Sequence, residues 1–489
     1  MFYYNREQRI FLLQIKHLNF KKIQRTVKTI LSQEYATAAI YYIVANIIGQ
    51  GIVLLSSAIF TRMMSKTDYG LVSTYSAWVL ILNTFICLNL FVSARNAYID
   101  FPDDYDRFNS SVLFLSILIG ISITLVLLCF SIIFKFKAGK GEILLACMQA
   151  IALNIINYKL AIQSMKNEYK QRALLLIAPN WTHTLLSIIL MFVFASNLYI
   201  SKITGNMLGL LIFGTISAVG LFRISAPAII LRYWKYALIL SIPLIFHTLA
   251  DLILIQSDRL MLTTLVGADI TAEYSIIYNV GYIVVTICIA INGAWLPFFF
   301  NKLSENKIED IKKAQVGYIL FFTLLTCGIL TVSPELVKII SPQSYWKGLG
   351  YANLIILASY IIFMYTLFTN YLTYMKKVKS IARNTFLAAT LNILLNYYLI
   401  PRYYSVGAAI STIISYFILF SLHFYSLGKE GRQYFSFSAI IINLLIVLTY
   451  GILFFVVYKM ILIRYFLFLF IFFAFYFFND RKKIIYFTE

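Results

Sequence analysis

The chain has 489 residues, of which 61% are hydrophobic and only 12% are charged, and this composition excludes a soluble globular protein. Its formal net charge is +21. A helix needs about 20 mostly apolar residues to cross a membrane. The charged clusters separate about fourteen segments of that kind, so the sequence predicts an all-α polytopic membrane protein. The predicted spans are 36–60, 75–94, 111–134, 143–163, 173–196, 203–222, 236–257, 274–300, 316–333, 349–374, 384–400, 406–427, 437–458 and 461–478.

The basic residues lie mainly between the predicted spans, and alternate loops differ in how many they carry. Lys and Arg are retained in the cytoplasmic loops of membrane proteins. Roughly 28 basic residues fall on one side of the membrane against roughly 12 on the other. Both termini are therefore predicted to be cytoplasmic. The positive charge is explained as a topology signal, so no nucleic-acid partner is expected.

Residues 1–35 are basic and broken by polar groups, and they lack the short apolar core of a secretory signal. We interpret them as a cytoplasmic interfacial segment; a disordered basic tail that only fixes orientation is the alternative. The five cysteines all lie in predicted spans without paired metal-ligand spacing, and no P-loop or GxGxxG turn is present. We expect no metal site, no cofactor and no disulfide framework.

The seventh predicted span carries ionisable residues at membrane depth, which is costly unless they face a protein interior or a water-filled cavity. His247, Asp251 and Asp258 lie at spacings of four and seven, within one helical face. This pattern predicts a functional site; a structural His–Asp pair, with Asp258 and Arg259 at the membrane boundary, is the alternative. Pro243 removes one backbone hydrogen bond and is a candidate hinge.

A weak internal repeat relates the second and eighth spans. TRMMSKTDYGLVSTYSAWVLIL follows the first span and LTTLVGADITAEYSIIYNVGYIVV follows the seventh, so Gly70 and Tyr75 align with Glu273 and Tyr278. Chance similarity between two amphipathic helix starts is the alternative. The repeat favours a six-plus-six arrangement. Its predicted parts are the segment 1–35, an N-lobe at 36–222, a linker at 223–235, a C-lobe at 236–428, two added helices at 437–478 and a cytoplasmic tail at 479–489.

Several motifs resemble the polysaccharide flippases of the multidrug, oligosaccharidyl-lipid and polysaccharide (MOP) exporter superfamily. They are SIPLIFHTLADLILIQSDRLML with Pro243 and the Asp258–Arg259 pair, LVGADITAEYSIIY, INGAWLPFFF with Trp295 and Pro297, and NYYLIPRYYSVGAAISTIISY. Glu273 stands where the family pattern has glycine. The resemblance implies two helical lobes around a central cavity that opens alternately to each side.

The resemblance also implies a function without enzymatic chemistry. Members of this family flip undecaprenyl-pyrophosphate-linked oligosaccharides across the bacterial cytoplasmic membrane, for O-antigen, capsule or other surface polysaccharide. The expected partners are this lipid-linked cargo, the bilayer, and a polysaccharide polymerase or chain-length regulator. Such a cargo needs cationic groups for its pyrophosphate and polar groups for its sugars.

Candidate cargo-binding residues in the first half of the chain are polar or basic. Asn46 and Gln50 share a face of the first span and either bind sugar or hydrogen-bond between packed helices. Arg62, at the outer end of that span, either holds the cargo before release or anchors the helix. Arg95 and Lys159, near the cytoplasmic ends of their spans, either meet the pyrophosphate or anchor and snorkel at the headgroups.

In the second half, His247 and Asp251 are the leading candidates. Their spacing also makes proton or Na⁺ coupling a hypothesis. Asn292 lies one turn from Trp295 in the eighth span, and Trp295 is more often an interface anchor than a stacking platform for sugar. Asn384, Asn392 and Asn396 share a face of the eleventh span, where a packing role is at least as reasonable.

Three alternatives remain open. A drug or cation antiporter of the same superfamily would need carboxylates in its spans, but the first six spans contain none and only Asp251 and Asp258 could serve. A membrane polymerase or ligase would need a large external loop, and no predicted external loop is much longer than twenty residues. A lipid II flippase has the nearest cargo, although the C-terminal motifs are more similar to the polysaccharide branch.

Overall fold

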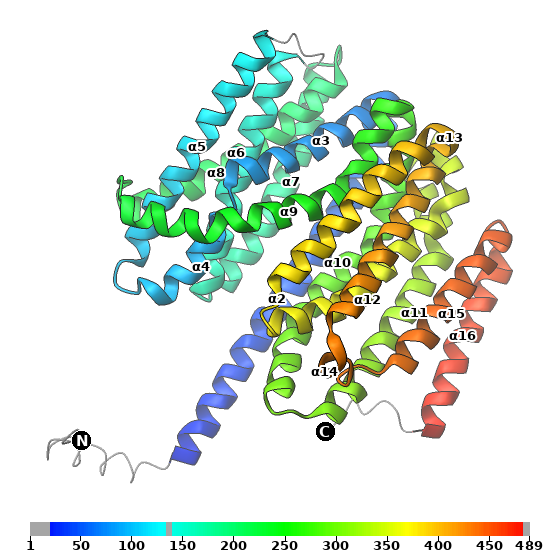
Figure 1. Ribbon diagram of the computed structural model, residues 1–489. Coiled ribbons are helices and arrows are strands. Elements are labelled where there is room, and N and C mark those ends of the chain that lie inside the picture. The colour runs from blue at the N-terminus through cyan, green and yellow to red at the C-terminus, as the bar shows by residue number, and fades with distance from the viewer. Residues whose placement is uncertain (1–19, 134–138, 483–489) are drawn as a thin grey trace, which may run out of the picture.

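Figure 1 shows the computed structural model of the chain, in which residues 20–133 and 139–482 are described. All regular structure within these residues is helical, which confirms the predicted all-α class. The helices are α2 (Phe20–Met63), α3 (Lys66–Cys87), α4 (Phe91–Asp100), α5 (Tyr105–Ile133), α6 (Lys140–Met165), α7 (Tyr169–Val193), α8 (Leu198–Ile224), α9 (Leu231–Leu265), α10 (Ala268–Ser304), α11 (Ile308–Ile340), the 3₁₀ helix η1 (Gln343–Tyr351), α12 (Ala352–Tyr374), α13 (Val378–Ser426), α14 (Gly428–Arg432), α15 (Phe437–Val457) and α16 (Ile461–Lys482).

Twelve helical segments of the described chain are long and apolar enough to cross a membrane. One of them, α13, bends at Tyr404, where φ is 52°, and so contains two of the predicted spans. Its two halves pack so closely that a Cβ on Gly407 would overlap the Leu399 carbonyl group. α16 adds a shorter apolar stretch, Ile461–Phe473. The structure is therefore consistent with about fourteen membrane-crossing helices.

Some predicted boundaries differ from the helices. The second span is interrupted, because Leu88 and Asn89 adopt positive φ angles of 44° and 54° between α3 and α4. The predicted linker at 223–235 is already helical from Leu231 onward. Of the predicted interfacial segment, residues 1–19 lie outside the described residues and the rest begins α2; of the predicted tail, residues 483–489 also lie outside them.

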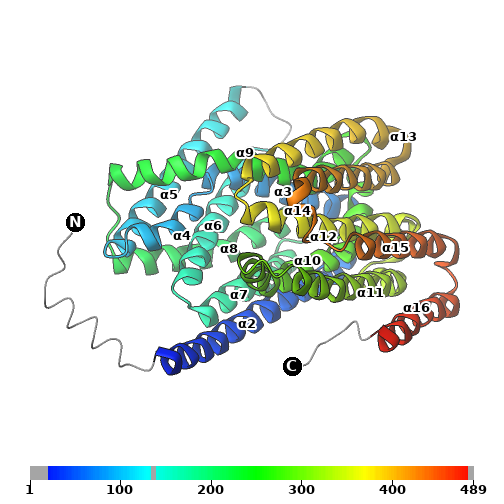
Figure 2. The same cartoon turned by 60° about the horizontal axis from the view of Figure 1, so that its bottom comes forward.

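The helices gather into two groups, and α9 runs from one to the other (Figure 1). We call α2–α8 the N-lobe and α10–α13 the C-lobe; the added helices α15 and α16 pack on α11. α2 lies beside α7 in its own lobe and also contacts α10 (Figure 2). α9 begins against the N-lobe, where the Trp234 indole donates to the Ser111 carbonyl oxygen at 3.1 Å. It ends against α13 in the C-lobe.

The turns lie at two opposite ends of the bundle, and each end is named here after one of its turns. The α2–α3 end contains the turn between α2 and α3 and the turns that join α9 to α10 and α11 to η1. Lys66 contacts Glu273 and the Ser344 carbonyl oxygen there. The α4–α5 end also contains the α6–α7, α10–α11 and α12–α13 turns, and a Lys166–Asp106 ion pair of 2.7 Å crosses it. Most of the basic loop residues that predict a cytoplasmic side lie at the α4–α5 end. The assignment of that end to the cytoplasm stays a prediction.

A fully buried carboxylate, Asp258, ties α9 to its neighbours in the C-lobe. It accepts hydrogen bonds from Thr412 at 2.6 Å, from the Asn396 amide at 2.7 Å and from the Tyr274 hydroxyl. Asn396 is bound in turn to Asn392 at 3.1 Å. Buried charges persist when hydrogen bonds satisfy them, so this network fixes the second half of α9 against α10 and both halves of α13.

Replacement of Asp258 by Ala is expected to destabilise the protein by about 1–3 kcal/mol or more, because three donors lose their acceptor in a buried site. The measurement is thermal unfolding of the purified protein in detergent. Glu309→Gln, at an exposed carboxylate of α11, is the control and should unfold like the parent protein. An unchanged unfolding temperature for Asp258→Ala would show that the network does not stabilise the fold.

Candidate functional site

The lobes meet along a polar seam, which is closed at the α2–α3 end by an ion pair. Lys66 at the start of α3 pairs with Glu273 in the first turns of α10, and the Lys66 ammonium also donates to the Ser344 carbonyl oxygen at 3.2 Å. Beside this pair, the Thr67 hydroxyl donates to Asp269. The Glu273 side chain is only 7% exposed, so the ion pair is shielded from water on its acidic side. Shielding strengthens the attraction between its charges.

The first turns of α3 and α10 approach each other at the same place. A Cβ on Gly70 would overlap the Ala268 carbonyl group, so a glycine is required for this contact. One turn further along α3, the hydroxyl groups of Thr74 and Thr263 lie 2.5 Å apart. The helix starts aligned by the sequence repeat therefore pack against each other across the seam, which the alignment alone could not reveal.

The end of α2 contacts the end of α11. The Thr61 hydroxyl donates to the Ile340 carbonyl oxygen at 2.9 Å, and the Arg62 guanidinium donates to the Ile339 carbonyl oxygen at 2.8 Å. The last carbonyl groups of a helix lack partners within the helix and attract cations. Arg62 therefore links the lobes in this structure. Its predicted role in holding cargo stays a prediction.

The polar stripe of α2 lies at the middle of the seam, but its members differ. Gln50 reaches α10, where its amide donates to the Asn279 carbonyl oxygen at 3.3 Å and its side-chain oxygen accepts from Thr286 at 3.2 Å. Asn46 donates to the Tyr42 carbonyl oxygen of its own helix at 2.8 Å. Gln50 is thus an inter-lobe contact. Asn46 is half-buried, and its side-chain oxygen accepts no hydrogen bond from the described residues.

The polar face predicted for α9 splits into two parts. His247 and Asp251 are half-buried and close enough to interact electrostatically, and the described part of the chain offers Asp251 no hydrogen bond. Asp258 belongs instead to the buried C-lobe network. Next to it, Arg259 donates to Gln256 at 2.8 Å and lies 4.7 Å from the centre of the Tyr278 ring. Only the first part of this face can receive a ligand without breaking the fold.

Basic residues of the N-lobe lie toward the α4–α5 end. Arg95 is exposed on the short helix α4, and Lys159 is half-buried on α6. Arg172 of α7 is not among the predicted cargo-binding residues; its guanidinium stacks 4.4 Å from the centre of the Tyr42 ring and donates to Ser164 at 3.2 Å. Within the described residues, none of these three cations forms an ion pair with a carboxylate.

The polar and aromatic residues of the eighth span are used in packing. The Asn292 side-chain oxygen accepts from Asn370 of α12 at 2.7 Å. Trp295 is buried and stacks on Tyr318 with ring centres 4.6 Å apart, so its ring is used in packing between helices. Pro297 lies within α10 and is exposed.

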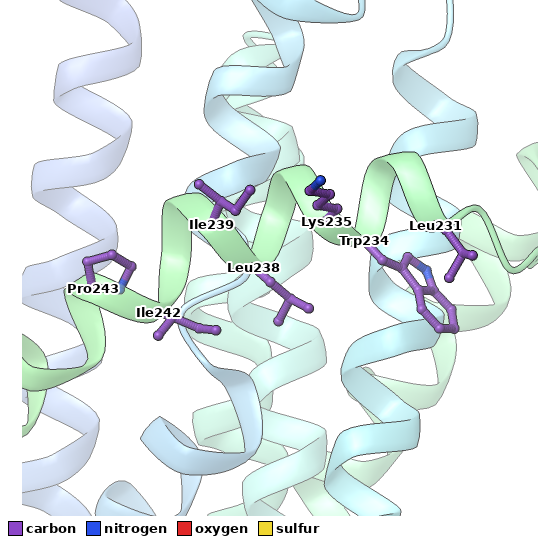
Figure 3. A pocket seen from close by; sticks show the side chains of 7 residues that line it. All are labelled: Leu231, Trp234, Lys235, Leu238, Ile239, Ile242 and Pro243. Atoms are coloured by element: carbon purple, nitrogen blue, oxygen red, sulfur yellow. The ribbon is translucent and has the colours of Figure 1, made fainter.

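The first half of α9 presents an open, mostly apolar surface with about 720 Å³ of accessible space beside it. Figure 3 shows that its lining side chains come from α9 alone: Leu231, Trp234, Lys235, Leu238, Ile239, Ile242 and Pro243. Lys235 supplies its one charge, near the α4–α5 end. An elongated apolar chain with an anionic head would match this arrangement. No group of three metal-ligating side chains was found among the described residues.

Comparison with known proteins identifies a sequence family and a fold. The polysaccharide biosynthesis protein family matches residues 36–302. A search of curated proteins found no match. The fold is similar to that of the structure titled "Lipid II flippase MurJ, inward closed conformation", with a TM-score of 0.67 and 16% identity over 90% of this chain and 99% of that chain.

Transporters of the MOP superfamily share the fold as well. An inward-facing multidrug resistance MATE family transporter aligns with a TM-score of 0.57 and 13% identity, over 80% of this chain and 98% of that one. A Pyrococcus furiosus transporter, in a structure titled for the reverse polarity of its binding pocket, aligns with a TM-score of 0.52 and 14% identity, over 80% and 95%. At these identities, the likeness concerns the fold.

Gly70→Ala is expected to open the seam at the α2–α3 end, because its new methyl group must displace the Ala268 carbonyl. Overpacking of this kind costs about 1–3 kcal/mol, which corresponds to a rise in the open population of roughly fivefold to more than a hundredfold. The readout is the reaction of a thiol reagent with Met64→Cys, a buried position, after replacement of the native cysteines. Gly220→Ala is the control, since a Cβ there meets no atom within 4 Å. Equal thiol reactivity in both variants would contradict the contact.

Proposed function

Because the chain belongs to the polysaccharide biosynthesis protein family, we propose that it transports a lipid-linked precursor of a surface polysaccharide. The proposed cargo is an oligosaccharide carried on undecaprenyl pyrophosphate, moved across the bacterial cytoplasmic membrane from the cytoplasmic to the external leaflet. The product would be O-antigen, capsule or a related polysaccharide. In this proposal the protein is not an enzyme; it exchanges conformations around an unchanged cargo.

The distribution of charge along the seam carries this proposal. The acidic residues at the seam are occupied, since Glu273 pairs with Lys66 and Asp269 accepts from Thr67. In contrast, Arg95, Lys159 and Arg172 have no carboxylate partner in the described part of the chain. Guanidinium and ammonium groups without a fixed counter-ion are suited to bind a pyrophosphate. An anionic cargo therefore fits better than a cationic one.

The open surface on α9 supports a lipid-linked cargo in particular. Its side chains are apolar except for Lys235, which lies in the part nearer the start of α9 (Figure 3). An isoprenoid chain gains free energy from contact with such a surface, although neighbouring lipid tails compete for it. The lipid part of the cargo would therefore follow α9 while its pyrophosphate meets the basic residues of the α4–α5 end.

The structure also supplies two halves that could exchange positions. Direct contacts from Arg62, Lys66 and Gly70 close the seam at the α2–α3 end. α9 is fixed to both lobes and carries Pro243 between its two attachments. A proline within a helix removes one backbone hydrogen bond and permits bending. Opening the α2–α3 end would release cargo on the external side, and a bend near Pro243 would allow the lobes to move.

One specific observation supports each of two alternative cargoes. A cation antiporter would depend on Asp251, the carboxylate of α9 that has no hydrogen bond among the described residues. A lipid II flippase would present the same pyrophosphate and tail as the proposed cargo, and the likeness in fold to such a protein allows it. Proton or Na⁺ coupling at His247 and Asp251 belongs to the same proposal. A polymerase or chain-length regulator would receive the exported units.

Replacement of both Arg95 and Lys159 by Ala is expected to lower export of the lipid-linked units, because each cation would contribute a charge-assisted contact to the pyrophosphate. The loss should be about tenfold or more. Export is measured in a deletion strain carrying each variant, as surface polysaccharide formed and lipid-linked units accumulated. Lys313→Ala, an exposed cation of α11, is the control. Normal export by the double variant would reduce both residues to membrane anchors.

Asp251→Asn is expected to abolish most export while the amount of protein in the membrane stays normal, because Asp251 is outside the buried network of Asp258. The comparison with Asp258→Ala separates function from folding, since that variant should be less abundant. Polysaccharide at the surface and immunoblots of the membrane fraction give the two measurements. Full export by Asp251→Asn would remove this residue from the cargo site and from ion coupling.

A further inference from the structure

Lys202 differs from the other charged side chains that are fully buried in the described chain. Asp258 has three hydrogen-bond donors, Glu273 pairs with Lys66, and Arg464 pairs with Glu335 at 2.6 Å. Lys202, in the second turn of α8, is only 6% exposed and has no carboxylate partner among the described residues. It is a buried, uncompensated ammonium group.

The protein contacts of the Lys202 ammonium group replace only part of the hydration that it would have in water. Its ammonium donates to the Asn206 side-chain oxygen at 3.0 Å and lies 3.5 Å from the centre of the Phe60 ring. A cation over an aromatic ring is attracted to it more strongly when water is excluded. Removing an ion from water remains costly even after the protein relaxes. The charged form is therefore sustained mainly by the Phe60 ring and one amide oxygen.

Lys202 lies on α8, which packs closely against α7, whereas Phe60 lies on α2 at the seam between the lobes. A Cβ on Gly205 would overlap the Ser187 backbone, and one on Gly209 would overlap the His183 backbone, so α7 and α8 cannot slide at this point. Phe60 directly precedes Thr61 and Arg62, whose side chains hold the end of α11. A change in the attraction between Lys202 and Phe60 would therefore act on the contact that closes the α2–α3 end.

Other titratable groups lie around this part of α8. His183 of α7 is the neighbour that interacts with Lys202, and its Nε2 atom donates to the Asn180 side-chain oxygen at 3.3 Å. On α6 and α3, Glu142, Cys147 and Tyr75 form a separate group with Tyr199 of α8 itself. Further groups on the packed elements are Arg62 of α2, which is turned toward the Ile339 carbonyl oxygen, and Cys129 of α5, which is exposed.

We propose that Lys202 is a proton-binding site, and that the bound proton stabilises closure of the seam at the α2–α3 end. When the ammonium gives its proton to water at the exposed turn before α8 (residues 194–197), the neutral amine can still donate to Asn206. It no longer attracts the Phe60 ring, because that attraction depends on the positive charge. Phe60 and the adjacent contacts to α11 are then released, and the closed state loses stability.

This inference goes beyond the proposed cargo, and it is tested on purified protein without any cargo. Spin labels at Ala195→Cys and Gln343→Cys, both at exposed turns of the α2–α3 end, report the distance between the lobes after replacement of the native cysteines. The open-to-closed ratio of the parent protein should rise as the pH is raised across the range in which the protein stays folded. One proton limits this rise to about tenfold per pH unit.

Three variants decide the question. Lys202→Met should make the ratio independent of pH, and Lys202→Arg, which keeps a permanent charge and guards against loss of folding, should hold the closed state over the whole range. His183→Gln should keep the pH dependence of the parent protein. The proposal is wrong if the parent protein shows no pH dependence, if Lys202→Met or Lys202→Arg retains it, or if His183→Gln abolishes it. Normal or defective cargo export does not affect this outcome.

Discussion

Contact between the first turns of α3 and α10 is the constraint on which the arrangement of the lobes depends. Gly70 allows the backbones to meet, and Lys66 and Glu273 add an ion pair beside that contact. Both features are local and reversible, unlike the apolar packing within each lobe. The Lys66 side chain is 22% exposed, so water can reach its ammonium group when the ion pair breaks. The closed seam is therefore a contact that a conformational change can break without unfolding either lobe.

α9 connects the two lobes, which must move relative to each other in the proposed transport, and it is attached to both of them. Its second half is fixed by Asp258 to α10 and α13, whereas its first half lies on the N-lobe through Trp234 and the aromatic residues around Phe101. Pro243 lies between these attachments. The ionisable residues of one helix consequently differ in their surroundings: Asp258 is held by three hydrogen bonds in a buried network, whereas Asp251 has no hydrogen bond among the described residues.

The class of the protein and most of its spans follow from apolar segment length alone, and the structure agrees with those predictions. The family resemblance is confirmed by the match over residues 36–302. The break at Leu88 and Asn89 was not predicted, because neither residue is a glycine and the apolar pattern continues across it. Lys202 lies just before the predicted span 203–222, and its burial against Phe60 depends on a residue 142 positions away in sequence.

The contacts between the lobes could not be predicted from the sequence. The repeat pairs Gly70 with Glu273 by position, yet only the structure shows that the two helix starts touch and that Lys66 neutralises the carboxylate. The same holds for Gln50, whose role as an inter-lobe contact or a sugar ligand could not be separated by spacing. Helical periodicity identifies a polar face but does not identify what lies opposite to it.

The central claim is that the seam at the α2–α3 end must open for cargo to cross the membrane. A disulfide between Thr74→Cys and Thr263→Cys, whose native hydroxyl groups lie 2.5 Å apart, would hold it closed in a protein without other cysteines. Surface polysaccharide formed under oxidising conditions, compared with that formed after addition of a reductant, is the measurement. The account predicts loss of export in the oxidised protein and recovery on reduction. Undiminished export with the disulfide fully formed would contradict it.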